Sequence, residues 1–210
     1  EESRIDRSLN TNIRSIRVEK VDAYSLNFDF VKSLTDKIKF YYGTEYVLNN
    51  VKSSGTNENI ESGERLIGPS RYPDAKWQSI AAYANSQYKF SQKYLLQVGL
   101  RYNHFLLDAK FDTSFYPFPF TEANLNSGEI TGSVGFVYKP SDSWVISTNL
   151  STGFRTPNVD DIGKIFDSEP GSVVVPNPNL NSEYAYNVDV SLAKVITVSY
   201  THLTLPTKRI

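Results

Sequence analysis

The chain contains no cysteine and no methionine among its 210 residues. The absence of cysteine excludes disulfides and thiolate metal sites, and it leaves the redox compartment undetermined. No apolar run approaches the roughly 18 residues that a transmembrane helix requires, and no signal peptide begins at Glu1. Because the first residue is not methionine, we expect this chain to be an internal piece of a longer protein.

Signatures of enzyme chemistry are also missing. There is no cysteine nucleophile, no Gly-x-Ser-x-Gly elbow, no His-Glu-x-x-His zinc motif and no phosphate-binding glycine loop. The 22 basic and 23 acidic residues nearly balance, so there is no electrostatic reason to expect nucleic-acid binding. No segment has the sustained apolar recurrence and capping signals of a helix. We therefore predict no enzyme activity, no nucleic-acid partner, no cofactor and no metal site.

What the chain does contain is a series of long segments in which apolar and polar side chains alternate. A β-strand turns successive side chains to opposite faces. Trp144, Ile146 and Leu150 thus share one face of their segment, and Ser147 and Asn149 share the other. The chain holds 14 Tyr and 12 Phe. On the apolar faces of these segments, aromatic residues lie near the ends and aliphatic residues nearer the middle. This distribution is typical of aromatic girdles that flank a lipid-facing band.

The segments are connected alternately by short turns and long polar loops. The predicted hairpins are Val21–Ser33 with Lys37–Leu48, Ser79–Phe90 with Tyr94–Leu107, and Gly128–Lys139 with Ser143–Phe154. The predicted loops are Asn49–Gln78, Asp108–Ser127 and Arg155–Ser182, and a further strand follows from Tyr184 to Leu192. Short turns on one rim and long loops on the other are typical of outer-membrane barrels. We predict an all-β fold of antiparallel up-and-down strands, about seven strands of a larger transmembrane β-barrel.

Two alternatives share this alternation. One is a soluble β-sandwich binding module, whose strands usually run about 5–6 residues. The segments here are about twice that length, near the roughly 9–11 residues that cross a bilayer at a tilt. The other alternative is a passive porin or structural barrel, which has the same strand pattern and no plug domain.

The first two loops contain candidate ligand-binding side chains. The first loop carries Arg71 and Tyr72 among turn-forming residues. The second loop holds Phe115 and Tyr116 on a tip stiffened by neighbouring prolines. Exposed aromatic rings of this kind can grip an apolar ligand. Packing against neighbouring loops or the barrel wall is the favoured alternative, because apolar groups seek cover.

Two short motifs border the third loop. They are Phe154-Arg155-Thr156-Pro157, which closes one strand, and Asn177-Pro178-Asn179-Leu180, which opens the next. With the runs Gly43–Gly55, Arg71–Asp74 and Leu96–Phe105, they resemble the barrel of TonB-dependent outer-membrane receptors, particularly the haem, haemoglobin and transferrin receptor branch. The resemblance covers nearly the whole chain up to about Ala193. It is fairly specific for the family and only weakly specific for the ligand.

The resemblance implies a full barrel of about twenty-two strands in the outer membrane of a Gram-negative bacterium. It implies an active-transport receptor that captures an iron-containing or other nutrient ligand, such as haem, haemoglobin or an iron chelate, with its extracellular loops. The implied partners are outer-membrane lipid, the ligand and the TonB complex. The TonB complex would act through a plug domain and an energy-coupling box that are absent from this piece.

The third loop also has a physical interpretation of its own. Arg155 lies on the lumen-facing side of its strand, where its guanidinium fork could bind an anionic ligand or, as the preferred role, a carboxylate of a neighbouring loop. Pro157 ends one strand and Asn177-Pro178-Asn179 restarts the next, so both motifs are loop anchors first. Asp160 and Asp161 are further candidate ligand-binding residues, and they make the segment between the motifs acidic, which suits haem propionates poorly.

Haem ligation by this loop is not expected. Receptors of the resembling branch are expected to place a haem-ligating histidine between the two motifs, but residues 158–176 contain none. Tyr184 and Tyr186 follow the regular alternation, which favours lipid-facing or girdle positions. An axial donor would have to be His104 or come from a part of the protein absent here, and a lone histidine at a barrel rim is usually an ordinary surface residue.

The end of the chain departs from the pattern. From about Ile196 the sequence resembles an ending that recurs when a sequencing read runs into adapter sequence. We therefore expect residues 196–210 to be a non-native tail and residues 1–195 to be the partial receptor barrel. If the tail is native, Val195–Leu205 is a further strand.

Overall fold

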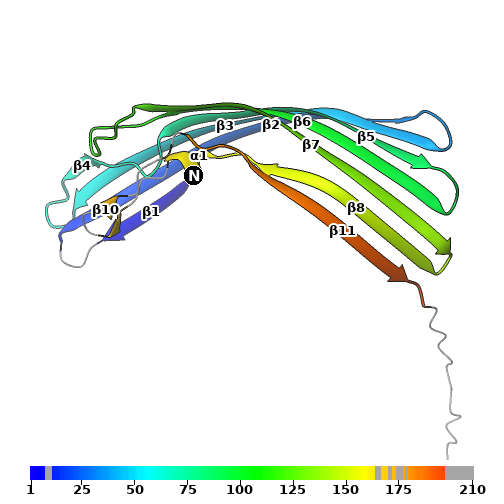
Figure 1. Cartoon of the computed structure of the whole chain (residues 1–210). Coiled ribbons are helices and arrows are strands. Elements are labelled where there is room, and N and C mark those ends of the chain that lie inside the picture. Colours follow the sequence, from blue (N-terminus) through cyan, green and yellow to red (C-terminus); the bar gives the residue numbers. More distant parts are fainter. Residues whose placement is uncertain (8–10, 164–166, 170–171, 174–176, 178, 197–210) are drawn as a thin grey trace, which may run out of the picture.

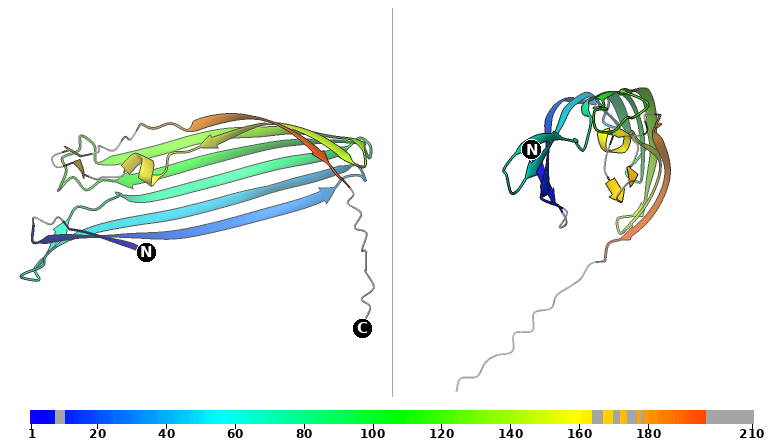
Figure 2. Two further views of the ribbon diagram at one scale, coloured as in Figure 1. Left: turned by 90° about the horizontal axis from the view of Figure 1, so that it is seen from below. Right: turned by 90° about the vertical axis from the view of Figure 1, so that its left-hand side faces the viewer.

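The computed structural model describes residues 1–7, 11–163, 167–169, 172–173, 177 and 179–196. These residues form one large antiparallel sheet, curved like a section of a barrel wall (Figure 1, Figure 2). The strands are β1 (Glu2–Arg7), β2 (Ile13–Ser33), β3 (Ile38–Asn59), β4 (Arg65–Gly68), β5 (Asp74–Lys89), β6 (Tyr94–Lys110), β7 (Glu122–Ser141), β8 (Trp144–Arg155), β9 (Asp167–Glu169), β10 (Ser172–Val173) and β11 (Glu183–Lys194). One short helix, α1 (Val159–Gly163), lies between β8 and β9.

The strand order confirms the up-and-down topology. The large sheet runs β1-β2-β3-β5-β6-β7-β8-β11, with β4 paired to β3, and β9 pairs with β10 in a separate small sheet. The seven predicted strands correspond to β2, β3, β5, β6, β7, β8 and β11. The sequence did not indicate β1, because Ile5 is its only apolar residue, or the four-residue β4.

The predicted loop boundaries were wrong, because several strands continue far into them. Strand β3 runs to Asn59 instead of ending at Leu48, and β5 begins at Asp74 instead of Ser79. Both strand extensions keep their backbone pairing, for example Val51 with Ala75. Above the lipid band both faces of a strand can meet water, so the alternation that marks a strand in the sequence is lost while the hydrogen-bond ladder continues.

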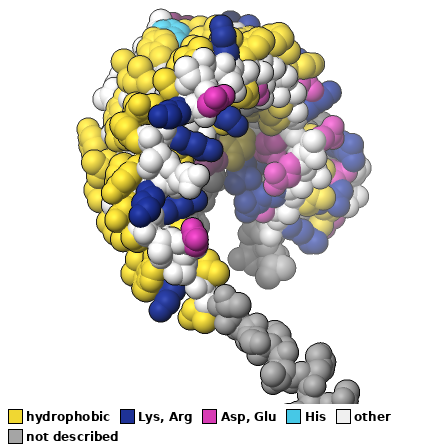
Figure 3. Space-filling view, turned by 90° about the vertical axis from the view of Figure 1, so that its right-hand side faces the viewer, with side chains coloured by type: hydrophobic (Ala, Val, Ile, Leu, Met, Phe, Trp, Pro, Cys, Tyr) yellow, Lys and Arg dark blue, Asp and Glu magenta, His cyan; other side chains and the backbone are white. Residues whose placement is uncertain are grey.

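The predicted faces are brought together by the cross-strand register. Val98 lies opposite Val134, Val134 opposite Leu150, and Leu150 opposite Val188, which makes a continuous apolar row. Viewed along the strands, hydrophobic side chains cover the convex outer face and polar ones line the concave inner face (Figure 3). No helix among the described residues is long and apolar enough to cross a membrane.

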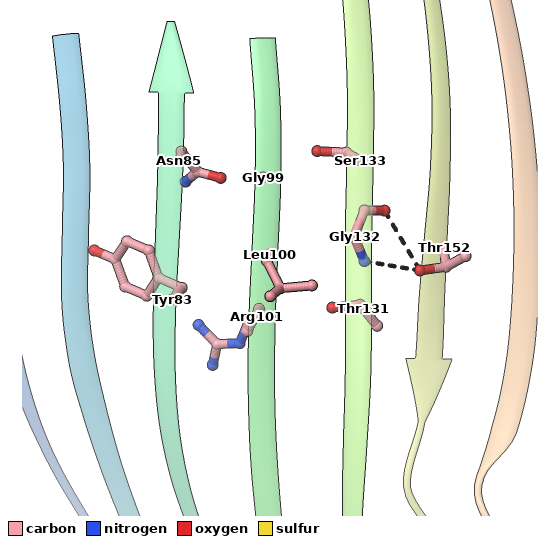
Figure 4. A pocket seen from close by; sticks show the side chains of 9 residues that line it. All are labelled: Tyr83, Asn85, Gly99, Leu100, Arg101, Thr131, Gly132, Ser133 and Thr152. Carbon is pink, nitrogen blue, oxygen red and sulfur yellow. Dashed lines mark hydrogen bonds between the residues drawn. The ribbon is translucent and has the colours of Figure 1, made fainter.

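The inner face is polar at mid-height, where a cavity of about 340 Å³ lies against β5, β6 and β7 (Figure 4). Arg101 contributes to this cavity and forms an ion pair with Glu45 at 2.9 Å. Gly99 permits close packing here, since a Cβ would come within 2.2 Å of the Asn85 side-chain oxygen. The Thr152 hydroxyl accepts a hydrogen bond of 2.9 Å from the Gly132 backbone N–H, just where the ladder between β7 and β8 ends (Figure 4).

The apolar core lies at the other, long-loop end of the inner face. Its buried members are Ala75, Leu107, Ala109, Phe111, Ala123, Val159 and Ile162. Two of these residues belong to the third loop, and the others belong to the wall or the adjoining second loop. The core therefore exists only because the third loop folds back onto the lumen side of the sheet.

Candidate functional site

The candidate site is the assembly of loops at the long-loop end, and α1 organises it. The helix begins with a reciprocal cap. The Asn158 side-chain oxygen accepts a hydrogen bond from the Asp161 N–H at 3.0 Å, and the Asp161 carboxylate accepts one from the Asn158 N–H at 3.0 Å. Such a capping box satisfies two backbone donors that would otherwise be unpaired at the start of a helix. This local pairing explains why a helix follows directly after Pro157.

The cap places one side of α1 against the wall. Val159 and Ile162, three residues apart and therefore on one side of the helix, are only 9% and 2% exposed. They belong to the same buried cluster as Leu107 and Ala109 of β6. Full burial of a side chain such as isoleucine contributes about 1.5–3 kcal/mol, so this contact is the main attachment of the helix to the sheet.

Arg155 and Asp161, both predicted ligand-binding residues, bind each other. The Nη2 atom of Arg155 lies 2.6 and 2.8 Å from the two oxygens of Asp161. The Arg155 side chain is 56% exposed, and pairs this accessible to water contribute little to stability. The pair fixes the orientation of α1 relative to the end of β8. The carboxylate partner of Arg155 lies in the third loop itself and not in a neighbouring loop.

Tyr72 joins the first loop to the third. Its hydroxyl donates a hydrogen bond of 2.6 Å to Asp160. Burial and this hydrogen bond raise the pKa of Tyr72 to about 12, so the hydroxyl remains a donor at neutral pH. The backbone N–H groups of Arg71 and Tyr72 donate to the Ser53 hydroxyl at 3.2 and 3.3 Å, which anchors this part of the loop on β3. The Arg71 guanidinium carbon lies 5.3 Å from the centre of the Tyr72 ring. Predicted residues from two loops are therefore brought together.

The second loop forms an aromatic cluster beside this contact. The rings of Phe118 and Phe120 stack with centroids 5.8 Å apart, and Phe111 meets Phe120 edge-on at 5.2 Å. Tyr116 packs against the buried core, whereas Phe115 remains 38% exposed. The two predicted residues of this loop are thus separated, and packing accounts for Tyr116.

The two family motifs act as anchors at the base of the third loop. The Phe154 ring meets the buried Phe105 ring at 5.3 Å, and Pro157 is buried. In the second motif the side-chain oxygen of Asn177 accepts a hydrogen bond of 3.0 Å from the Asn179 N–H, and Leu180 packs against the core. Thr156 is half-buried, and Pro178 lies outside the described residues.

Sequence reasoning missed three buried acidic residues near these loops, Glu19, Glu58 and Glu129. Of these, Glu58 is paired with Arg14 and Arg65. Strand β7 pairs with β8 only as far as Ser133 and Ser151, while β8 and β11 stay paired to Arg155. The Tyr184 hydroxyl donates a hydrogen bond to Glu129, so Tyr184 does not simply face lipid as we expected.

Glu19 is 7% exposed, and neither of its carboxylate oxygens has a partner among the described residues. It lies opposite Ser53 in the register. Glu129 is a single charge in a polar run, and Glu19 lies among other charged residues, so neither sequence context gives a signal of burial.

The remaining candidate metal ligands lie elsewhere. His104 is opposite Ile80 and Gly128, on the outer face, and its Nδ1 lies 3.2 Å from the Tyr102 hydroxyl. Tyr186 is 82% exposed. In the part of the chain that the structure describes, no three His, Cys, Asp or Glu side chains are grouped so as to hold a metal ion.

This topology and loop assembly can be compared with known proteins. Residues 3–205 match the family described as TonB dependent receptor-like, beta-barrel. The chain belongs to this family. A search of the curated proteins finds no match. Membership confirms the barrel fold and the location in the Gram-negative outer membrane, and it confirms that the chain is not an enzyme. It also removes the soluble sandwich from consideration.

Three solved structures show the same fold at low sequence identity. The copper transporter OprC has a TM-score of 0.67 and 16% identity over 86% of this chain and 28% of its own. The ferric yersiniabactin uptake receptor FyuA from Yersinia pestis has a TM-score of 0.62 and 12% identity over 92% of this chain and 29% of its own. A double mutant of the Serratia marcescens hemophore receptor HasR, in complex with its hemophore HasA and heme, has a TM-score of 0.60 and 16% identity over 86% of this chain and 30% of its own.

The chain thus spans less than a third of each of these structures. These proteins are described with different ligands, so the haem branch that the sequence resembles is one of several.

Proposed function

We propose that the complete protein is a TonB-coupled receptor that captures an iron-containing or other nutrient ligand with its extracellular loops and imports it. The observation that carries this proposal is the contact between loops. Helix α1 of the third loop is docked on the lumen side of the wall, and Asp160 of that helix accepts a hydrogen bond from Tyr72 of the first loop. Loops joined in this way can respond to a ligand as one unit.

The similar structures are of proteins described with copper, ferric yersiniabactin and heme, which supports a metal-containing nutrient. We propose that the ligand is a metal chelate rather than haem held by an axial histidine, since residues 158–176 contain no histidine and His104 lies on the outer face. Arg155 is already paired with Asp161. Arg71 has no ion-pair partner among the described residues, so we assign it to bind an acidic group of the ligand. Phe115, which is exposed, would provide an apolar contact.

The proposed energy source is the TonB complex acting on a plug domain elsewhere in the protein. In this scheme the loops of this part of the protein bind the ligand, and the plug domain opens the path through the barrel. A ligand that rearranges the Tyr72–Asp160 contact would change the shape of the lumen-facing loops. Coupling to the plug requires such a change, because a ligand can shift an equilibrium only through differential binding to its two states.

The test uses the full-length receptor in its host, growing on defined iron or copper sources, with ligand binding measured on whole cells. Deletion of residues 159–175, which keeps both motifs, should abolish ligand capture while outer-membrane abundance stays normal. His104→Ala is the matched control and should leave uptake nearly unchanged. Uptake by the deletion variant at the level of the intact receptor would contradict the proposal, and loss of uptake in His104→Ala would point to haem ligation instead.

A further inference from the structure

The rim with the short turns is strongly basic. Its lysines are Lys32, Lys37, Lys39, Lys89, Lys93, Lys139 and Lys194, and its acidic residues are Asp36 and Asp142. Viewed onto this rim, Lys and Arg side chains follow the edge of the curved wall, between the apolar outer face and the hollow (Figure 3). In barrels of this kind the short turns face the periplasm, so this charge lies at the periplasmic edge of the membrane.

Four of these lysines are held in two directly opposed pairs. The N–H of Lys89 donates to the carbonyl of Lys37 at 2.8 Å, and the N–H of Lys139 donates to the carbonyl of Lys93 at 2.8 Å. Like charges in directly opposite positions on neighbouring strands are destabilising. All four side chains are exposed, and none forms an ion pair within the part of the chain that the structure describes. One carboxylate, Asp36, lines the same cavity as the four lysines, so the wall compensates only part of their positive charge.

The four lysines surround a cavity of about 650 Å³. Two girdle residues also line it, Phe90 and Tyr94, which are 47% and 39% exposed. The Tyr94 ring stacks on that of Tyr138 with centroids 4.8 Å apart. The cavity is thus lined by lysines and, on one side, by Phe90 and Tyr94 of the aromatic girdle.

We propose that this cavity binds the phosphate of an anionic glycerophospholipid headgroup from the periplasmic leaflet. Aromatic girdles mark the depth of the headgroups, so Phe90 and Tyr94 place the cavity at that depth. Lysine ammonium groups bind phosphate as point charges, and their long stems can reach from the strand ends to the interface. Basic pockets at membrane edges recognise anionic headgroups in the same way.

The competing occupant is an acidic polypeptide segment in the lumen. The strand register favours this occupant to some extent. Lys89 is opposite Leu95 and Leu95 is opposite Val137, so these side chains share the inner face of the sheet. Two exposed girdle rings on the cavity wall favour lipid more strongly, since a segment confined to the lumen would leave Phe90 and Tyr94 without a role in the site.

The test uses the purified full-length receptor in nanodiscs of phosphatidylcholine containing phosphatidylglycerol, with the bound lipid measured by native mass spectrometry. The test variant carries Lys37→Gln, Lys89→Gln, Lys93→Gln and Lys139→Gln. The matched control has the same change in charge at the opposite end, Lys20→Gln, Lys52→Gln, Lys76→Gln and Lys110→Gln. The intact receptor should retain phosphatidylglycerol over phosphatidylcholine. The test variant should lose about tenfold of that preference, and the control should keep it.

Three outcomes would overturn the inference. Equal lipid preference in the intact receptor and the test variant would show that the lysines do not bind headgroups. Loss of thermal stability by the test variant in pure phosphatidylcholine, with lipid retention unchanged, would assign the lysines to an acidic polypeptide. Complete displacement of phosphatidylglycerol by millimolar inorganic phosphate would show that the site takes free phosphate instead of lipid.

Discussion

The two rims of the wall differ in their ion pairs. At the long-loop rim, three arginines are paired with acids: Arg14 and Arg65 both bind Glu58, and Arg155 binds Asp161. Lysines are present towards this end too, and Lys20 lies opposite Lys52. At the short-turn rim, the charged residues are mostly lysines, and the opposed pairs have no acidic partner among the described residues. The long-loop rim is thus cross-linked by its own ion pairs, whereas the short-turn rim is the one for which we propose an anionic partner outside the wall.

The choice of residue fits this division. Arginine presents a rigid fork that matches a carboxylate, while lysine is a flexible and strongly hydrated point charge. Glu58 receives arginines from β2 and from β4, so one carboxylate ties three strands together. Exposed ion pairs individually contribute little to stability. Their role at the outer rim is to position the strands that carry the loops.

The largest expected difference between the rims concerns packing. Leu107, in the core of the outer rim, is fully buried. Leu107→Ala in the full-length barrel should lower the free energy of unfolding by about 2–5 kcal/mol, because it leaves a cavity. The control is Leu95→Ala on the same strand, where the side chain is only half-buried and the loss should be clearly smaller. Urea unfolding in detergent measures both, and equal losses would mean that α1 does not seal the outer core.

In the lipid-facing band between the rims, the cost of adding a charge should depend on which face of the strand carries it. Val98→Arg, on the apolar face, should cost about 2–4 kcal/mol near the bilayer midplane, because the charge meets lipid. Gln97→Arg, the neighbour on the lumen face, should be much milder. Folding titrations of the two variants into lipid vesicles provide the comparison. Similar costs at both positions would show that the face assignment is wrong.

Removing one charge should lower protease resistance at the long-loop rim only. Glu58→Gln leaves Arg14 and Arg65 without their shared acceptor, so the outer ends of β2 and β4 should become more accessible to protease. Lys89→Gln removes one member of an opposed lysine pair, so in detergent without anionic lipid it should leave protease resistance unchanged or increased. Limited proteolysis of the purified receptor distinguishes the two, and increased cleavage after Lys89→Gln would remove the contrast between the rims.

The smallest effect concerns the Tyr72–Asp160 hydrogen bond. Tyr72→Phe should weaken the attachment of the first loop to the third by about 0.5–1.5 kcal/mol, measurable by hydrogen exchange in the loops. The folded pKa of Tyr72 is raised to about 12 from the ordinary value of 10.0. The contribution is therefore fully present below pH 10 and is lost as the pH rises through about 12. Loop protection that changed between pH 6 and 9 would exclude Tyr72 as its source.

Most of the candidate site could not be predicted as a unit. The sequence indicated Arg155, Asp160 and Asp161, and the pair Arg155–Asp161 is only six residues apart. The Tyr72–Asp160 contact spans 88 residues, so its two partners meet only because the sheet brings the first and third loops to one rim. Glu129 and Tyr184 meet because β8 leaves β7 after Ser151, a departure that no local pattern encodes.

The sequence by itself determined the seven long strands, their two faces and the position of the short turns. These features are local, since alternation reports which face of a strand meets lipid, and a turn is set by a few residues. Only the tertiary structure decided how far the strands rise above the membrane, where α1 docks and which loop residues pair. Those features depend on backbone ladders and on packing between distant segments, and neither changes the pattern of side chains along the chain.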